Sequence, residues 1–296
     1  MVRNSRPAPS KSKLSRLNLR PTLTLPHPQG LFLCQKLYNE GMKIDIKDFF
    51  ASCPKGVAHR GFHDLDAPEN SEAAFKSAIK HHLPFECDVH LSKDGELIVC
   101  HDSSLLRVTG KEGIIEELSL EEIKHYHLED GSSLLTLDEL YSFWKEKVPL
   151  VLELKVATDN EKPLASRVRS FLKKVKDLSK LVLISFSEEV LEELTDVPFN
   201  RGLLIGEKKD LSYKKRHSYD LSKYDFIDLN VLFLHFPMFS TYRKNGGFIL
   251  TWTVRSKGDY LLSKSRADCP TWEVVDCRDK KEDRKINSFL IEKAIN

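Results

Sequence analysis

The sequence predicts an α/β protein that folds as one (β/α)8 TIM barrel with parallel strands. Short apolar segments of strand character alternate with helical segments, which predicts a parallel sheet. Eight such strands can be counted, and eight strands close a barrel. The chain has 296 residues, and a barrel of this type needs about 250. The strands are expected near positions 57, 85, 150, 182, 203, 227, 250 and 274.

Residues 1–41 are expected to be a basic, poorly ordered extension in front of the barrel. Residues 1–40 hold seven Lys or Arg and one acidic residue. A transit peptide, a flexible basic tail and a segment foreign to the native protein are the three interpretations. We expect Met42 to be the physiological start, or residues 1–41 to be dispensable, so that 42–296 forms a single domain. A 42–296 fragment that fails to fold or loses activity would contradict this.

Composition excludes several classes of protein. After residue 40 there are 39 basic and 43 acidic residues, and this mildly acidic body argues against nucleic acid as a partner. No apolar run approaches the roughly 18–20 residues of a transmembrane segment. Cysteines at 34, 53, 87, 100, 269 and 277 include no Cys-x-x-Cys pair, which indicates reduced thiols and a cytoplasmic location, or an organellar one if 1–41 is a transit peptide. The sequence does not determine an oligomeric state.

The first barrel strand leads into a polar triplet. Val57-Ala58 is apolar, so His59-Arg60-Gly61 falls where this strand ends. Asn70-Ser71 is a candidate cap for a helix over Glu72–His81.

The second strand, Pro84–His90, carries two carboxylates on one face. Side chains alternate along a strand, so Glu86 and Asp88 point the same way. Two buried carboxylates repel each other and lose solvation unless a positive charge lies between them, and a divalent cation is the simplest such charge. A solvated rim or a salt bridge would explain the pair if it stood alone. However, several polar groups lie at strand ends within one short segment, and this conjunction favours a metal site over either explanation.

A short returning strand, Leu97–Cys100, follows a turn at Lys93-Asp94-Gly95 and is not counted among the eight. His101 and Asp102 come at its end. A single His before an Asp is usually a turn or capping residue, but the same conjunction of polar groups favours a functional role.

The next barrel strand, Val148–Lys155, is nearly all apolar, as expected for a buried parallel strand. It follows two capping boxes, Ser119–Glu122 and Thr136–Glu139, whose helices are expected to reach about Tyr126 and Trp144. Glu153 and Lys155 lie two apart and so share a face. Alone they would be an ordinary rim pair, but at the end of an apolar strand they are typical of a barrel mouth.

The remaining segments continue the alternation. The basic stretch 208–216 is expected to be a solvated loop, and the segment from His101 to Glu153 is too short for a large cap domain. The other expected elements are helix 161–178, strand Leu181–Ser185, helix Glu188–Leu194, strand Arg201–Ile205, strand Phe226–Asn230, a helix near Phe239–Lys244, strand Phe248–Val254, strand Trp272–Asp276 and helix Arg284–Ala294.

Five motifs together resemble the glycerophosphodiester phosphodiesterase family. They are His-Arg-Gly at 59–61, Pro-Glu-Asn-Ser at 68–71, Glu-x-Asp at 86–88, Asp-Gly at 94–95 and His-Asp at 101–102. Few unrelated chains would carry all five in this order and spacing. The resemblance covers about residues 57–278 and implies a barrel of the phospholipase-C-like phosphodiesterase type.

The resemblance implies metal-dependent hydrolysis of a small glycerophosphodiester to sn-glycerol 3-phosphate and an alcohol such as choline or ethanolamine. Glu86, Asp88 and Glu153 are the implied ligands of one divalent metal ion, and their hard oxygens suit Mg²⁺, Ca²⁺ or Mn²⁺. His59 and His101, with ordinary pKa values near ~6.5, would divide the acid and base roles. The sequence does not tell which histidine takes which role.

Three further residues are implied in substrate binding. Arg60 and Lys155 would offset the charge of the phosphate, and Trp252 would lie beside the substrate. Asp102 is a candidate to orient His101.

The chain departs from the family pattern in two places. Arg255 replaces the Asn of a Trp-Thr-Val-Asn motif, where an Arg could bind a second anionic group or close a salt bridge. Residues 267–278 only partly match the family's Gly-x-Asp-Gly-Ile-Ile-Thr-Asp-Arg-Pro-like stretch. This leaves the alcohol specificity open.

Two other functions compete with this one. A phospholipase D-like or phosphatidylinositol-cleaving enzyme would act on membrane lipid, aided by the basic extension and by Phe49, Phe50 and Phe62 as exposed aromatics, although no amphipathic anchor is evident. A degenerate, non-catalytic barrel would only bind phosphodiesters. It predicts the loss of a site residue, and none is missing.

Overall fold

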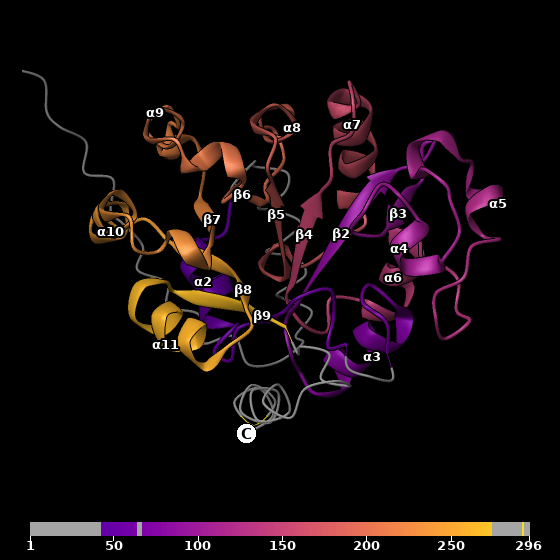
Figure 1. Cartoon of the computed structure of the whole chain (residues 1–296), viewed down its shortest axis with the longest axis horizontal. Coiled ribbons are helices and arrows are strands. Elements are labelled where there is room, and N and C mark those ends of the chain that lie inside the picture. The colour runs from indigo at the N-terminus through magenta and orange to yellow at the C-terminus, as the bar shows by residue number, and fades with distance from the viewer. Residues whose placement is uncertain (1–42, 64–66, 274–291, 293–296) are drawn as a thin grey trace, which may run out of the picture.

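The computed structural model of the chain describes residues 43–63, 67–273 and 292. Eight strands run parallel and close into a barrel, because β1 pairs with β2 on one side and with β9 on the other (Figure 1). The predicted (β/α)8 barrel is therefore confirmed. The barrel strands are β1 (Val57–Ala58), β2 (Phe85–Leu91), β4 (Leu150–Leu154), β5 (Leu181–Ser185), β6 (Asn200–Ile205), β7 (Phe226–Asn230), β8 (Ile249–Val254) and β9 (Cys269–Trp272).

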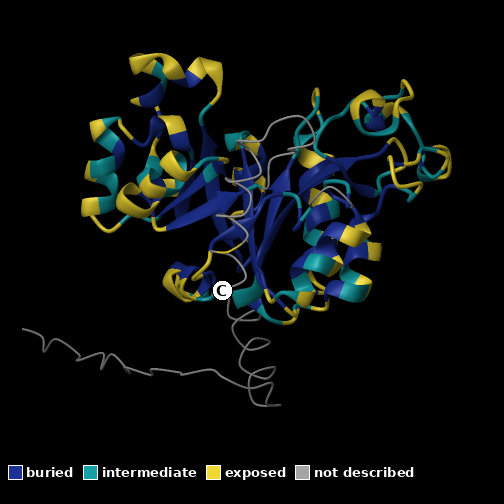
Figure 2. Cartoon of the chain, turned by 60° about the horizontal axis from the view of Figure 1, so that its bottom comes forward, coloured by how far each residue is buried: buried dark blue, intermediate teal, exposed yellow. Residues whose placement is uncertain are grey.

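The helices surround these strands with their inner sides buried and their outer sides exposed (Figure 2). Ser71 caps α3, and the two predicted capping boxes are both formed at α5 and α6. The α-helices are α2 (Ile46–Ala51), α3 (Glu72–Lys80), α4 (Leu106–Thr109), α5 (Leu120–Ile123), α6 (Leu137–Trp144), α7 (Glu161–Leu172), α8 (Glu188–Glu193), α9 (Tyr213–Arg216), α10 (Pro237–Lys244) and α11 (Lys257–Arg266).

The strands are apolar on both faces because one face packs on the helices and the other fills the barrel. The barrel filling includes Val151, Ile184 and Leu204, together with Phe49 and Phe50 of α2. Helix α2 therefore closes one end of the barrel. The ring of Phe50 stacks on Phe248 with centroids 5.6 Å apart, and meets Phe226 edge-on.

The expectation of exposed aromatics before and after β1 is wrong. Phe49, Phe50 and Phe62 are 1%, 9% and 5% exposed. The first two pack inside the barrel end, and the ring of Phe62 meets Trp272 edge-on at 5.8 Å. A short amphipathic helix has the same pattern of apolar and polar residues whether it binds a surface or closes a barrel. The sequence therefore could not distinguish these two roles.

We expect Phe49→Ala to lower the free energy of unfolding by about 3–5 kcal/mol, because it empties a fully packed position of the barrel end. Urea denaturation would measure the loss. The control is Leu261→Ala on α11, where the side chain is 57% exposed and the change should stay within about 0.5 kcal/mol. Equal small effects for both variants would show that α2 does not support the barrel.

Three other segments differ from expectation. The basic stretch 208–216 is largely exposed, as expected, but it is not an irregular loop, because it forms a 3₁₀ helix, Lys208–Leu211, followed by α9. The Arg216 side chain is buried, donates hydrogen bonds to the carbonyl oxygens of Asp210 and Leu211, and lies 3.8 Å from the ring centre of Phe236. Its partners are backbone oxygens and an aromatic face, which no charge pattern reveals.

The last described strand, β9, lies three residues earlier than expected, at Cys269–Trp272, and α7 ends at Leu172 instead of residue 178. The expectations for residues 1–41, 274–276 and 284–294 fall outside the described residues, except that Glu292 is described and is helical.

A ninth strand, β3 (Leu97–Val99), pairs antiparallel with β2 and is not part of the barrel, as expected. The segment between β3 and β4 packs a small apolar cluster of its own. This cluster consists of Ile98, Cys100, Leu105, Ile115, Ile123, Leu128 and Leu134.

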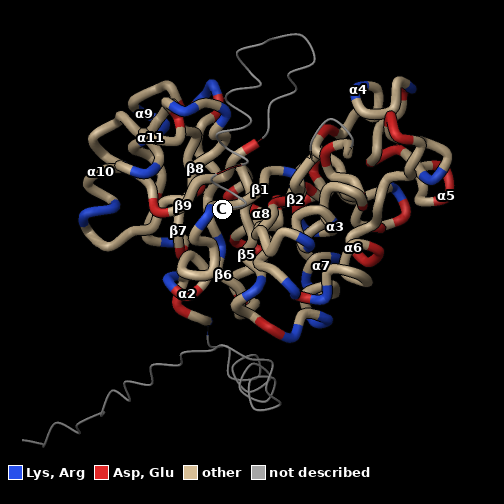
Figure 3. Tube along the Cα trace, turned by 90° about the horizontal axis from the view of Figure 1, so that it is seen from below, with Lys and Arg blue, Asp and Glu red and all other residues tan. Residues whose placement is uncertain are grey.

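Basic and acidic positions are interspersed over the outer elements (Figure 3). Four cysteines of the described part of the chain are free and buried. None of the helices described is both long and apolar enough to cross a membrane. The expected cytoplasmic location and the expected absence of a nucleic-acid partner stay predictions.

Candidate active site

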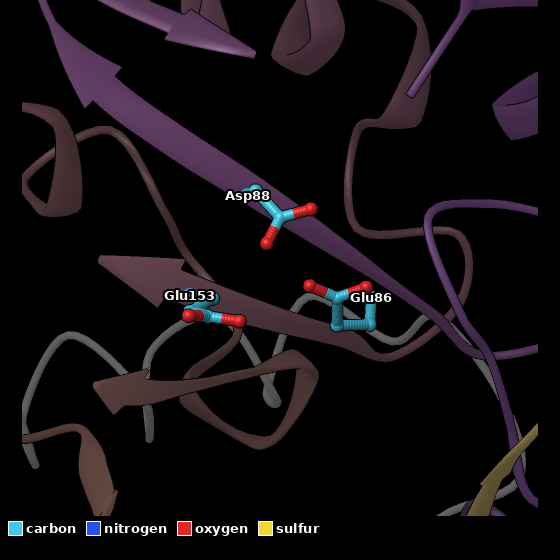
Figure 4. Close-up of side chains that lie close together, drawn as sticks. All are labelled: Glu86, Asp88 and Glu153. Carbon is cyan, nitrogen blue, oxygen red and sulfur yellow. The ribbon is translucent and has the colours of Figure 1, made fainter. Parts of the chain in front are cut away.

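Three buried carboxylates lie together where β2 and β4 approach the mouth of the barrel. Asp88 and Glu153 are direct neighbours in the register of these parallel strands, and Glu86 precedes Asp88 by two positions on the same face. One oxygen of each of the three lies within 4.8 Å of the others. Figure 4 shows the three carboxylates turned toward one another. The structure thus brings together the ligand set that the resemblance implies.

The donor set fits a hard divalent cation. Glu86 Oε1 is buried and accepts no hydrogen bond from any described residue, and among these residues none donates one of good geometry to Asp88 Oδ1 or Glu153 Oε1. Burial raises the pKa of Glu86 well above its usual value, and the charges of Asp88 and Glu153 raise it further. Burial also raises the pKa of Glu153 to about 7 despite a neighbouring lysine. Carboxyl groups in this state favour a proton or a metal ion.

Lys155 and Arg60 supply positive charge beside the carboxylates. Lys155 Nζ lies 3.0 Å from Asp88 Oδ1 and 2.6 Å from Glu153 Oε1. Arg60 Nε lies 3.5 Å from Asp88 Oδ2, and the backbone N–H of Arg60 donates to Glu86 Oε2 at 2.8 Å. Burial by itself would raise the pKa of Asp88, but Lys155 and Arg60 outweigh it and hold this pKa well below the usual range.

His59 is held by a carboxylate from the far end of the chain. Its Nδ1 lies 2.7 Å from Glu273 Oε2, and an ionised carboxylate can only accept, so Nδ1 carries the hydrogen. Its Nε2 lies 4.0 Å from Glu86 Oε2, on the side of the cluster. Burial lowers the pKa of His59 to about 4, although Glu273 opposes the shift. His59 is therefore a neutral imidazole whose Nε2 faces the carboxylates.

His101 has the same arrangement on the other side. Its Nδ1 lies 2.6 Å from Asp102 Oδ1, and Arg107 Nε donates to the other oxygen of Asp102. Burial lowers the pKa of His101, while Asp88 opposes the shift. The His101 side chain is 32% exposed, against 9% for His59. The expectation that Asp102 contacts its neighbour therefore agrees with the structure.

Trp252 lies on β8 inside the barrel. Its indole N–H donates to the carbonyl oxygen of Asp228 at 3.2 Å, and its ring meets Phe186 edge-on with centroids 5.6 Å apart. Its described contacts do not join it to the carboxylates.

Two residues of the site were missed by sequence reasoning. Of the candidate cap Asn70-Ser71, Ser71 caps α3 as predicted, whereas Asn70 Nδ2 donates to Asp88 Oδ2 at 2.9 Å. Glu273 was placed inside a strand, whereas it follows β9 and meets His59. A polar residue just after an apolar strand is the signal that could have found Glu273, had the end of β9 been placed correctly.

The sequence model of the glycerophosphoryl diester phosphodiesterase family matches residues 59–275, well over half of the chain. An uncharacterized protein of Mycoplasma genitalium is 34% identical over 169 residues, which are 52% of this chain and 68% of that protein. A glycerophosphodiester phosphodiesterase of Caldanaerobacter subterraneus subsp. tengcongensis is 46% identical over 69 residues, 23% of this chain and 28% of that protein. These matches thus cover only part of either relative.

Solved structures share the fold at low identity. An Oleispira antarctica phosphodiesterase, in complex with its product sn-glycerol-3-phosphate, aligns with a TM-score of 0.68 and 22% identity, over 82% of this chain and 99% of that one. A glycerophosphodiester phosphodiesterase of Thermotoga maritima aligns with a TM-score of 0.62 and 24% identity, over 80% and 96% of the two chains.

Proposed function

The chain belongs to the glycerophosphoryl diester phosphodiesterase family, and from that premise we propose that it hydrolyses small glycerophosphodiesters to sn-glycerol 3-phosphate and an alcohol. The enzyme class expected from the sequence is confirmed at the level of the family. The observation that carries the proposal is the cluster of three buried carboxylates between two cations and two carboxylate-bound histidines. The product bound to the Oleispira protein supports the choice of product.

Glu86, Asp88 and Glu153 would hold one divalent metal ion, Mg²⁺ or Ca²⁺, with Mn²⁺ also suited to these oxygens. When bound, such an ion polarises a phosphoryl oxygen and offsets the charge of the phosphate.

Lys155 and Arg60 would bind the unesterified phosphate oxygens. Three carboxylates and one divalent ion leave a net charge of about −1, which would repel a phosphodiester anion. The two cations reverse that sign. Lys155 acts as a point charge and Arg60 as a planar donor, and both already lie against Asp88.

His59 is proposed as the general base and His101 as the general acid. His59 Nε2 accepts a proton from the attacking water as the new P–O bond forms, and Glu273 stabilises the imidazolium. The protonated form of His101, which Asp102 stabilises, gives its Nε2 proton to the alcohol oxygen as the old P–O bond breaks. Because burial lowers the pKa of His101, this form is the minor one at neutral pH. His101 is the more exposed of the two, which supports its place on the side from which the alcohol leaves.

The test is release of sn-glycerol 3-phosphate from diesters of glycerol phosphate with choline, ethanolamine, glycerol and inositol. Each is assayed with Mg²⁺, with Ca²⁺ and with a chelator. Release that the chelator abolishes and added metal restores supports the proposal, and the best substrate identifies the alcohol. No release under any metal would contradict it. The membrane-lipid alternative is not favoured, because the aromatics assigned to it are buried.

We expect metal binding to strengthen as pH rises from 6 to 8. The pKa of Glu153 is about 7, so protons compete with the ion below that pH and are released when it binds. Titration of this one group predicts a dissociation constant about tenfold lower at pH 8 than at pH 6. Calorimetry in buffers of different ionisation enthalpy would measure both affinity and proton release. A flat profile would show that Glu153 is ionised throughout.

A further inference from the structure

The two departures from the family pattern meet in one ion pair. Arg255 stands just after β8, where the pattern has Asn, and Glu273 lies in the poorly matching stretch after β9. Arg255 Nη2 donates to Glu273 Oε2 at 2.8 Å. Of the two alternatives for Arg255, the structure therefore has the salt bridge.

The carboxylate of this ion pair also contacts His59, the proposed general base. The same oxygen, Glu273 Oε2, lies 2.7 Å from Nδ1 of His59. We propose that Arg255 is a positioning residue for His59. By holding Glu273 Oε2 in place, it keeps the imidazole turned with Nδ1–H toward Glu273 and Nε2 toward Glu86. The inference rests on the proposed function for the role of His59.

Glu273 needs such a partner because only its backbone is fixed by the sheet. Its N–H donates to the carbonyl oxygen of Val254 at 3.1 Å, while three torsions separate its backbone from the carboxylate. Two donors on one oxygen restrict those torsions more than His59 alone would. Arg255 can do this while half exposed, at 50% of its side chain, so its guanidinium stays hydrated.

The same order of groups recurs at the second histidine. Arg107 donates to Asp102, and Asp102 accepts from His101. On both sides of the metal-ligand cluster, a cation thus contacts a carboxylate, and that carboxylate contacts a histidine. An accidental rim pair would not be expected to end on a site histidine in both places.

The first test is kinetic, with the full chain, its metal and the best substrate. We expect Arg255→Asn to lower kcat about 5–20-fold with KM changed less than twofold, and Arg255→Lys to recover most of the loss. Glu273→Gln should lower kcat further, and adding Arg255→Asn to it should cost less than another twofold. A raised KM at unchanged kcat would mean that Arg255 binds substrate. If the kcat losses of the two single variants multiply in the double variant, Arg255 acts independently of Glu273. Either result overturns the proposal.

The matched control is Arg243→Asn. Arg243 pairs with Asp268 just before β9, at 2.9 Å, as Arg255 pairs with Glu273 just after it. This variant should leave kcat unchanged.

The second test needs no turnover and so separates this inference from the proposed function. In nitrogen-15 NMR, His59 should show a slowly exchanging Nδ1–H, identified by its absence in His59→Ala. Arg255→Asn should speed its exchange, and Arg243→Asn should not. An Nδ1–H equally protected in Arg255→Asn would overturn the proposal, whether or not the protein hydrolyses any diester.

Discussion

His101→Ala is expected to lower kcat for glycerophosphodiesters by about 10²–10⁴-fold, the usual contribution of a general acid or base. Folding and metal affinity should be unchanged, because the His101 side chain is partly exposed and is not one of the three clustered ligands. The size of the loss should depend on the leaving group. A glycerol phosphate ester of p-nitrophenol has a weakly basic leaving group that needs little protonation, so its hydrolysis should suffer far less.

His59→Ala should slow both substrates alike, because the attacking water is the same in each. His125→Ala is the control, since this exposed histidine belongs to the same segment between β3 and β4. If His59→Ala spares the p-nitrophenyl ester and His101→Ala does not, the two roles are reversed. Near-normal rates in His101→Ala would exclude it from catalysis.

Glu153→Gln is expected to raise the dissociation constant for Mg²⁺ or Ca²⁺ by more than about 100-fold. Loss of an outer-sphere partner of a metal typically lowers the metal affinity 10–100-fold. Glu153 supplies one of the three clustered oxygens, so its loss should cost more than that. The amide keeps the shape of the side chain and removes its charge. Calorimetry would measure the affinity, and the rate as a function of metal concentration should shift in parallel.

Asp228→Asn is the matched control for that measurement. Asp228 is also buried inside the barrel, on β7, and one of its oxygens accepts no hydrogen bond from the part of the chain that the structure describes. Burial raises the pKa of Asp228 well above its usual value, and the amide keeps the shape of the side chain, so the substitution leaves the three clustered oxygens in place. An unchanged affinity in Glu153→Gln, or an equal loss in Asp228→Asn, would contradict the ligand set.

The parts of the site that local sequence could predict are those set by the two-residue period of a strand. Glu86 with Asp88, and Glu153 with Lys155, each share a face of one strand, and parallel register then brings the pairs together. The strands themselves were placed correctly to within a few residues because they are short, apolar and separated by capped helices.

The parts that could not be predicted depend on contacts between distant segments. Glu273 meets His59 across 214 positions of the chain, and no local pattern marks one as the partner of the other. The sequence predicts Phe49 and Phe50 to be exposed, because no neighbouring residue indicates that α2 enters the barrel end. Asn70 and Ser71 both belong to residue types that commonly cap helices, so the sequence does not reveal that Asn70 instead donates to Asp88 on β2.

The apolar cluster between β3 and β4 determines which part of this protein can be altered by mutation near His101. Leu105, Ile115, Ile123 and Leu128 pack with one another and not with the cluster that fills the barrel. Substitutions of these four residues therefore alter the surroundings of His101 and leave the barrel filling intact, whereas Glu116 of the same segment contacts His90 of β2 at 2.7 Å and is best kept. A segment that packs on itself and lies beside His101 is therefore the place where directed evolution of this protein should begin.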